Sequence, residues 1–147
     1  MLTKDLLYEG RIAKWQDIID IYNFDCKIGQ IRMLPKLTDE HVIPDKIRKM
    51  KVSYCSKVLS ERVAATLRYT AQFTQHQDGS ILSSTYKNTA DAVEFFDKLF
   101  DSCNGSRTGN VAGKIRGAVK ESSQHLVFWK DAINKIKNIN FLEKKRT

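Results

Sequence analysis

An amphipathic segment that runs into a polar turn, from Thr89 to Arg107, constrains the fold of this chain most strongly. Its apolar side chains recur every three or four residues, as they do along one face of an α-helix. These side chains are Val93, Phe96, Leu99, Phe100 and Cys103. We expect Asn88 or Thr89 to cap the start of the helix and Gly105 to end it. The pattern predicts a buried apolar stripe, with Asp101 and Asn104 at the last turn and its exit.

The length and composition are those of one globular domain over residues 1–147. The chain has 147 residues, of which 41% are hydrophobic and 29% are charged. Such a chain is long enough to bury a sizeable core and too apolar to be disordered. No apolar run approaches the length of about 18 residues that a membrane span needs, and the first residues lack the apolar stretch of a secretion signal.

Hydrophobic periodicity elsewhere predicts further helices. We expect one near residues 11–24, a short helical turn after Thr38, and one long helix over about residues 45–73. A last helix holds Leu126, Trp129, Ile133 and Ile136. No stretch alternates convincingly as a strand does. The expected fold class is therefore all-α, a compact bundle of about four to six helices.

The charge and the cysteines narrow the classes of partner. The 25 Lys and Arg residues outnumber the 17 Asp and Glu residues, which gives a formal net charge of +8, and much of the excess lies late in the chain. This balance is compatible with a polyanionic partner, although lysine-rich helices can also simply be well solvated. Cys26, Cys55 and Cys103 form no CxxC motif, so we expect neither a zinc site nor a disulfide framework.

Several segments in order resemble one protein family. Residues 95–102, FFDKLFDS, with the following Asn104 resemble a signature of P-element-type transposases, in the GTP-binding domain inserted within their nuclease fold. The segments 34–41 (LPKLTDEH), 49–65 (KMKV…VLS…VAA) and 113–129 resemble further stretches of the same domain, as does the spacing of apolar residues in the first helix. The resemblance extends over most of the chain.

The resemblance implies a guanine nucleotide site. Carried over position by position, its residues are Lys36, Lys51, Val52, Ser60, Phe100, Asp101 and Asn104. The two lysines suit phosphate oxygens, and the Ser60 hydroxyl suits phosphate or ribose. Asp101 can accept from the N1–H and N2–H₂ groups of guanine, a pattern that adenine lacks. Phe100 and Val52 can enclose the base. Taken without the resemblance, these residues fit ordinary surface and helix-end roles.

The better-known GTP-binding motifs are absent. Residues 109–114, GNVAGK, are one residue too short for a Walker A loop, and residues 88–91, NTAD, lack the lysine of an NKxD box. The sequence contains no recognisable set of catalytic residues for GTP hydrolysis. The resemblance implies that GTP and Mg²⁺ act as cofactors that help position a transposon DNA end without hydrolysis. Two departures from the family pattern are Glu61 after Ser60 and Glu121-Ser122 in place of Asp-Asn, so the role of Glu121 stays open.

The expected function is that of a binding module rather than an enzyme. By the resemblance, the nuclease carboxylates and the zinc DNA-binding module are not in this chain, which is expected to be a piece of a transposase with DNA as its partner in the full enzyme. The family also implies a nuclear location. One alternative is a basic helical remnant that binds nucleic acid or protein without nucleotide. Another is a chain that no longer folds stably by itself.

Overall fold

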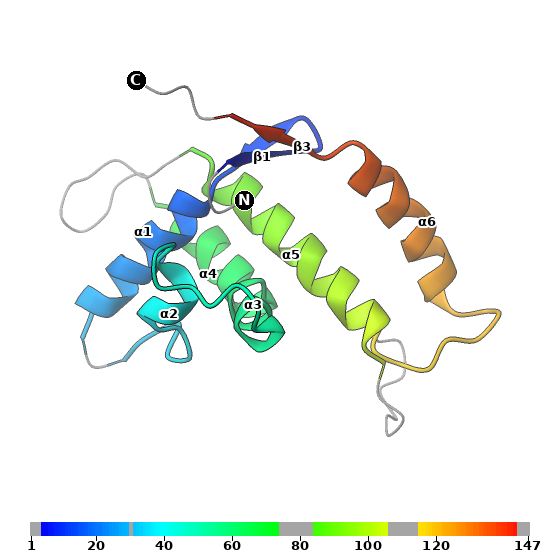
Figure 1. Cartoon of the computed structure of the whole chain (residues 1–147), viewed down its shortest axis with the longest axis horizontal. Coiled ribbons are helices and arrows are strands. Elements are labelled where there is room, and N and C mark those ends of the chain that lie inside the picture. The colour runs from blue at the N-terminus through cyan, green and yellow to red at the C-terminus, as the bar shows by residue number, and fades with distance from the viewer. Residues whose placement is uncertain (1–3, 30, 74–83, 106–114, 144–147) are drawn as a thin grey trace.

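The computed structural model describes residues 4–29, 31–73, 84–105 and 115–143, in which helices predominate (Figure 1). The helices are α1 (Trp15–Lys27), α2 (Asp39–Val42), α3 (Val52–Val58), α4 (Glu61–Thr70), α5 (Tyr86–Cys103) and α6 (Gln124–Lys137). The strands are β1 (Asp5–Tyr8), β2 (Arg11–Ala13) and β3 (Asn140–Leu142). The expectation of a mostly helical domain is confirmed, but the all-α class is wrong, because the strands form a small antiparallel sheet.

The sheet joins the two ends of the described chain. β1 lies between β2 and β3, and Leu6 pairs with Ala13 on one side and with Phe141 on the other. The β1–β2 turn consists of Glu9 and Gly10, whose φ angles of 48° and 74° are those of a tight hairpin. Strands of three or four residues are too short to show alternation, and the partner β3 is remote in sequence. The sheet could therefore not be recognised from the sequence.

α1 begins at Trp15 rather than near Arg11, because residues 11–13 form β2 and Lys14 is extended. The indole Nε1 of Trp15 donates a hydrogen bond of 2.9 Å to the Val42 carbonyl and so ties α1 to α2. Thr38 is the N-cap residue of α2, as predicted, and its backbone N–H donates to His41 Nδ1 at 3.1 Å.

The single long helix predicted for residues 45–73 is wrong. The structure has two helices there, α3 and α4, which are separated by Leu59 and Ser60 in non-helical conformations. Ser60 caps α4: its Oγ accepts from the Val63 N–H at 3.4 Å and donates to the Lys57 carbonyl at 3.1 Å. A serine hydroxyl offers the backbone an alternative to helical hydrogen bonds, which is why serine favours caps over helix interiors.

α5 is the central helix, and it begins about one turn before the predicted start. Its N-cap residue is Thr85, while Thr89 is fully buried inside the helix. The Thr89 hydroxyl donates to the buried Asp17 carboxylate and accepts from the Lys14 N–H at 3.0 Å, so it connects α5 with α1. The predicted apolar stripe is buried at Val93 but reaches the surface by Phe100, which is 39% exposed.

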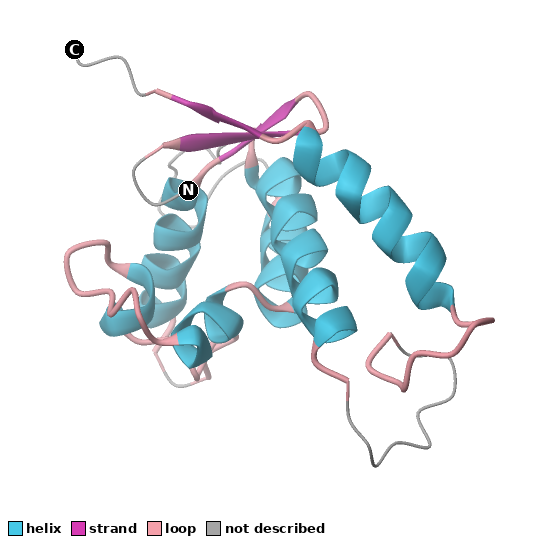
Figure 2. Ribbon diagram, turned by 45° about the vertical axis from the view of Figure 1, so that its right-hand side comes forward, coloured by secondary structure: helices cyan, strands magenta, loops and turns pink. Residues whose placement is uncertain are grey.

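Two apolar clusters hold the helices and the sheet together. α1, α3, α4 and the first half of α5 bury the larger cluster, which includes Ile18, Val63 and Leu67. The smaller cluster lies between the sheet, α5 and α6, where Phe95 packs with Leu6 and Ala132. α6 lies alongside α5 and leads into β3 (Figure 2).

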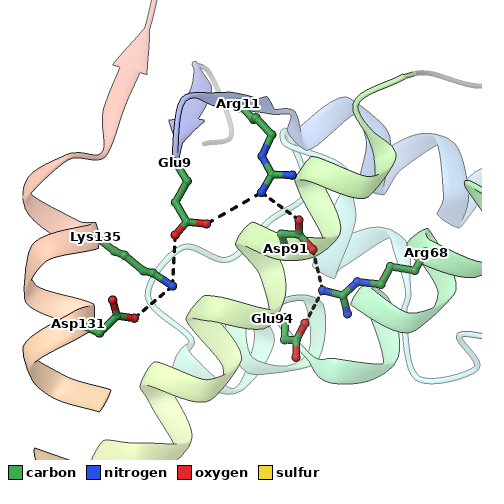
Figure 3. A network of polar contacts seen from close by, with 7 residues as sticks. All are labelled: Glu9, Arg11, Arg68, Asp91, Glu94, Asp131 and Lys135. Carbon is green, nitrogen blue, oxygen red and sulfur yellow. Dashed lines mark hydrogen bonds and ion pairs between the residues drawn. The ribbon is translucent and has the colours of Figure 1, made fainter. Parts of the chain in front are cut away.

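A chain of ion pairs crosses the same boundary between the sheet and the helices (Figure 3). On α4, Arg68 bonds to both Asp91 and Glu94 of α5. From the hairpin, Arg11 Nη2 lies 3.4 Å from Asp91, and Glu9 lies 3.2 Å from Lys135 of α6. The network thus joins the hairpin to α4, α5 and α6.

Candidate nucleotide site

The end of α5 presents three of the sequence-predicted site residues. Asp101 lies in the last turn, and Asn104 is the C-cap residue, whose N–H donates to the Phe100 and Asp101 carbonyls at 3.0 and 3.3 Å. Phe100 and Asn104 are both exposed. An aromatic ring, a carboxylate and an amide are therefore gathered at one helix terminus, as predicted.

Asp101 is engaged by a residue that sequence reasoning did not assign to the site. Arg116 Nη2 donates to Asp101 Oδ1 at 2.6 Å, and this bond raises the pKa of the arginine. One turn earlier on α5, burial raises the pKa of Asp97, and the charge of Asp101 adds to that shift. The site thus has two carboxylates and one guanidinium within electrostatic reach of each other.

Ser60 lies close to this cluster. The next residue, Glu61, donates its backbone N–H to Asp97 Oδ2 at 3.0 Å, which places the start of α4 against the last turns of α5. The Ser60 hydroxyl donates to one backbone carbonyl and accepts from one N–H. Because a hydroxyl oxygen has two lone pairs, one acceptor position of Ser60 is left for a ligand.

Lys51 and Val52 stand at the opposite end of α3 from Ser60. That helix has seven residues and is about 10 Å long. Lys51 Nζ lies 5.0 Å from the centroid of the Tyr54 ring, and the Val52 side chain is 65% exposed. Lys36 is exposed in the turn between the buried Leu34 and Leu37, and no hydrogen bond or ion pair joins it to another described residue. The structure therefore brings Ser60 to the α5 terminus, whereas no hydrogen bond or ion pair between described residues ties Lys36 to the other predicted site residues.

Two hollows accompany these residues. The first, which we call the α5-exit hollow, has a volume of about 410 Å³. It is lined by Ser102, Cys103, Gly105, Gly117, Ala118, Val119 and Trp129. The second, the α1–α3 hollow, has a volume of about 310 Å³. It is lined by Trp15, His41, Ile47, Arg48, Lys49, Lys51, Tyr54, Cys55 and Val58. Lys51 borders the second hollow, so the predicted site residues are divided between two places.

The α5-exit hollow depends on contacts of α6 with α5 and with the segment that precedes α6. Trp129 Nε1 of α6 donates to Ser102 Oγ of α5 at 3.0 Å, and His125 Nε2 lies 2.5 Å from the Ile115 carbonyl oxygen. These bonds hold the segment with Arg116 beside the end of α5. In the sequence, Arg116 is recognisable only as one of many basic residues. Its distance from Asp101 along the chain gives no indication that the two side chains pair.

Two further findings concern metal binding and membrane spanning. Across the described ranges, no three His, Cys, Asp or Glu side chains are grouped so that they could hold a metal ion. None of the described helices combines the length and the apolar character needed to cross a membrane. The GNVAGK segment considered above lies outside the described residues, and Asn88 to Asp91 form part of α5 rather than a nucleotide-binding loop.

Comparison with known proteins places the chain in a family. Residues 3–114 match the family described as "TNP-like, GTP-binding insertion domain". The fold is similar to that in the solved Drosophila P element transposase strand transfer complex, with a TM-score of 0.75 and 18% sequence identity. That match covers 99% of this chain and 31% of the transposase chain, so the present chain spans about a third of its length. No curated protein matches the sequence. Because the family match extends over most of its length, the chain belongs to the family of TNP-like, GTP-binding insertion domains.

Proposed function

We propose that this domain binds a guanine nucleotide at the end of α5. The observation that carries the proposal is the position of Asp101 at that terminus, between the exposed Phe100 and the exposed C-cap residue Asn104. A carboxylate accepts two hydrogen bonds from the N1–H and N2–H₂ edge of guanine, and an aromatic ring can cover its face. Adenine has no matching pair of donors. The name of the family supports the same ligand.

The rest of the nucleotide would extend from this terminus toward α3. Ser60 retains an acceptor position for a ribose hydroxyl, and Lys51 carries a point charge suited to phosphate. We propose that Val52 contacts the ligand and that Lys36 adds a second phosphate contact. Arg116 has to release Asp101 when guanine binds.

Mg²⁺ is proposed to arrive with the nucleotide. In nucleotide sites this ion is held mainly by phosphate oxygens and waters, with one or two protein carboxylates. The described residues contain no ready cluster of three ligands, which is compatible with binding through the phosphates. Glu121, which is exposed, is not assigned a role.

We further propose that the domain serves a larger P-element-like transposase in the nucleus, where it helps to position the DNA ends. The solved structure with the similar fold is a transposase strand transfer complex, and the net charge of +8 suits a position near DNA. Cutting and joining of DNA would reside in other parts of such an enzyme, because the family is an inserted domain.

Thermal unfolding of the purified domain with Mg²⁺ and GTP, Mg²⁺ and ATP, or Mg²⁺ alone tests the proposal. A ligand that binds only the folded state stabilises it by roughly 2.7 kcal/mol at a hundredfold excess over its dissociation constant. We expect GTP to raise the midpoint of unfolding and ATP to leave it unchanged. The rise should disappear in Asp101→Ala.

Two control variants separate the guanine contact from general effects of charge. Asp131→Ala removes another carboxylate, which pairs with Lys135 on α6, and should keep the GTP response. Arg116→Ala breaks the ion pair with Asp101 and should also keep it. A cooperative unfolding transition whose midpoint does not change with millimolar GTP would refute the proposal. It would favour the alternative, a basic helical module that binds nucleic acid or protein without nucleotide.

A further inference from the structure

A tight turn just before α2 carries Lys36 at its tip. The Leu37 N–H donates to the Leu34 carbonyl at 3.1 Å, the hydrogen bond that closes a β-turn over residues 34–37. Pro35 stands at the second position of this turn, which favours proline because its ring already sets the φ angle needed there. Leu34 and Leu37 are both buried in the larger apolar cluster. The backbone on either side of Lys36 is therefore anchored in the core, while Lys36 itself is exposed.

A buried carboxylate in the last turn of α1 holds the entrance to this turn. Asp25, which is fully buried, accepts hydrogen bonds from the Met33 N–H at 2.6 Å and from the Leu34 N–H at 3.1 Å. It also accepts from Arg32 Nε at 3.1 Å. A carboxylate removed from water is tolerated only when its oxygens are bonded in this way. Asp25 thus fixes the chain just before Lys36.

Arg32 extends this hold to the exit of the turn. Its Nη2 donates to the Leu37 carbonyl at 3.2 Å, while its Nε donates to Asp25. The guanidinium also lies over the Tyr22 ring of α1, 5.6 Å from the ring centroid. A planar guanidinium can bond two acceptors and contact an aromatic face at the same time, a geometry that a lysine ammonium does not reproduce. Arg32 therefore ties the residue that follows Lys36 to α1.

We propose that Asp25 and Arg32 are positioning residues, which hold Lys36 in place for the phosphates of the nucleotide. This rests on the proposed function, in which Lys36 contacts phosphate. Among the described residues, no hydrogen bond or ion pair engages the Lys36 ammonium, so it is available to a ligand while its backbone is held. A lysine on an ordered backbone loses less conformational entropy on binding than one on a loose loop. Asp25 and Arg32 act through Lys36 and do not contact the nucleotide themselves.

Isothermal titration calorimetry of the domain with GTP and Mg²⁺, and separately with guanosine, tests the proposal. We expect Arg32→Ala to weaken GTP binding roughly threefold to tenfold, because the ligand must then order the segment that carries Lys36. Guanosine has no phosphate, so its affinity should change less than about twofold. Arg32→Lys keeps the charge but cannot bond both Asp25 and the Leu37 carbonyl, so it should lose as much affinity for GTP as Arg32→Ala does. Lys27→Ala removes an exposed positive charge from the last turn of α1 and is the matched control, which should bind both ligands as the unmodified domain does.

A double-mutant cycle separates positioning from direct contact. If Arg32 acts through Lys36, Arg32→Ala causes no further loss of GTP affinity once Lys36→Ala is present. Losses that multiply would show that Arg32 contacts a phosphate itself, and would overturn the proposal. Equal losses for GTP and guanosine would overturn it as well, because they would indicate a general loss of structure.

Asp25→Asn replaces one acceptor oxygen by an amide donor and should show the same pattern as Arg32→Ala, with GTP binding weakened and guanosine binding kept. Circular dichroism of each variant establishes that it is folded. Because Asp25 is fully buried and Arg32 is not, the Arg32 variants decide the question if Asp25→Asn does not fold.

Limited cleavage by trypsin, read by mass spectrometry, reports on the turn without any nucleotide. We expect Arg32→Ala to be cut after Lys36 faster than the unmodified domain, relative to the cut after Lys27, because the turn opens more often. Unchanged cleavage would overturn the proposal, since Arg32 would then not hold the turn. If the unmodified domain binds no GTP, both the proposed function and the positioning are overturned. If Lys36→Ala weakens GTP binding and Arg32→Ala does not, the positioning alone is overturned.

Discussion

Arg116 Nη2 donates to Asp101 Oδ1 at 2.6 Å, so the carboxylate that we propose to recognise guanine already has a cationic partner. The two residues come from opposite sides of the connector that follows α5. The arginine side chain is 60% exposed and the aspartate side chain 20% exposed. An ion pair of this exposure is worth at most about 1 kcal/mol, so a ligand can displace it.

Arg116→Ala is expected to strengthen GTP binding up to about fivefold, because guanine no longer competes with the guanidinium for Asp101. Isothermal titration calorimetry of both proteins with GTP measures the change. Lys120→Ala, which removes another exposed cation of the same segment, is the control. Weaker binding by Arg116→Ala would show instead that the guanidinium contacts the nucleotide.

Ser60→Ala is expected to destabilise the domain by about 1 kcal/mol, because the first turn of α4 loses its cap. The melting temperature of a domain of this size should fall by roughly 2–4 °C. Urea unfolding of Ser60→Ala and of Ser53→Ala, an exposed serine inside α3, separates the cap from the loss of a hydroxyl. Equal stability of both variants would mean that Val63 N–H finds another acceptor.

Arg68→Ala is expected to cost about 1 kcal/mol of stability, because Arg68 joins α4 to both Asp91 and Glu94 of α5. The loss should shrink as sodium chloride rises toward about 1 M, where charges on partly exposed groups are screened. Arg62→Ala, on the exposed face of the same helix, should have little effect. A loss for Arg68→Ala that is independent of salt would point to packing of its aliphatic part.

His41 is expected to make the domain less stable in mild acid. Burial first, and then the charge of Lys57, lower its pKa below the ordinary value of 6.5, while Glu40 opposes the shift. The unfolded chain therefore takes up a proton at a higher pH than the folded domain does. The stability that His41 contributes is present above about pH 6.5 and is lost as the pH falls toward the folded-state pKa.

Urea unfolding at pH 7.5 and at pH 5.5 measures this effect. The unmodified domain should lose more stability between the two values than His41→Gln does, because the carboxylates titrate in both proteins. Identical losses would show that protonation of His41 does not affect the folded state.

The α5 terminus was predictable because its signal is local. Helical spacing from Val93 to Phe100 and the polar residues after it indicate an amphipathic helix with a polar exit, and both are present. The start of α5 was predicted one turn late, because Thr89 resembles a cap in sequence. Its hydroxyl instead satisfies the buried Asp17 of α1, a partner far away in the sequence.

The break between α3 and α4 shows the limits of periodicity. Apolar residues continue at helical spacing through residues 45–73, yet Ser60 ends that continuity with a capping hydroxyl. The sheet was missed for another reason, since β3 pairs with β1 across nearly the whole chain.

The sequence by itself determined which segments are amphipathic, although not where each helix begins and ends, that the chain belongs to one family, and which residue types stand at its proposed site. These properties follow from side-chain periodicity and residue order. The tertiary structure decided that Arg116 holds Asp101, that Ser60 lies near the α5 terminus, and that Lys51 borders a separate hollow. Contacts between segments far apart in sequence depend on how buried faces pack, and no local pattern contains that information.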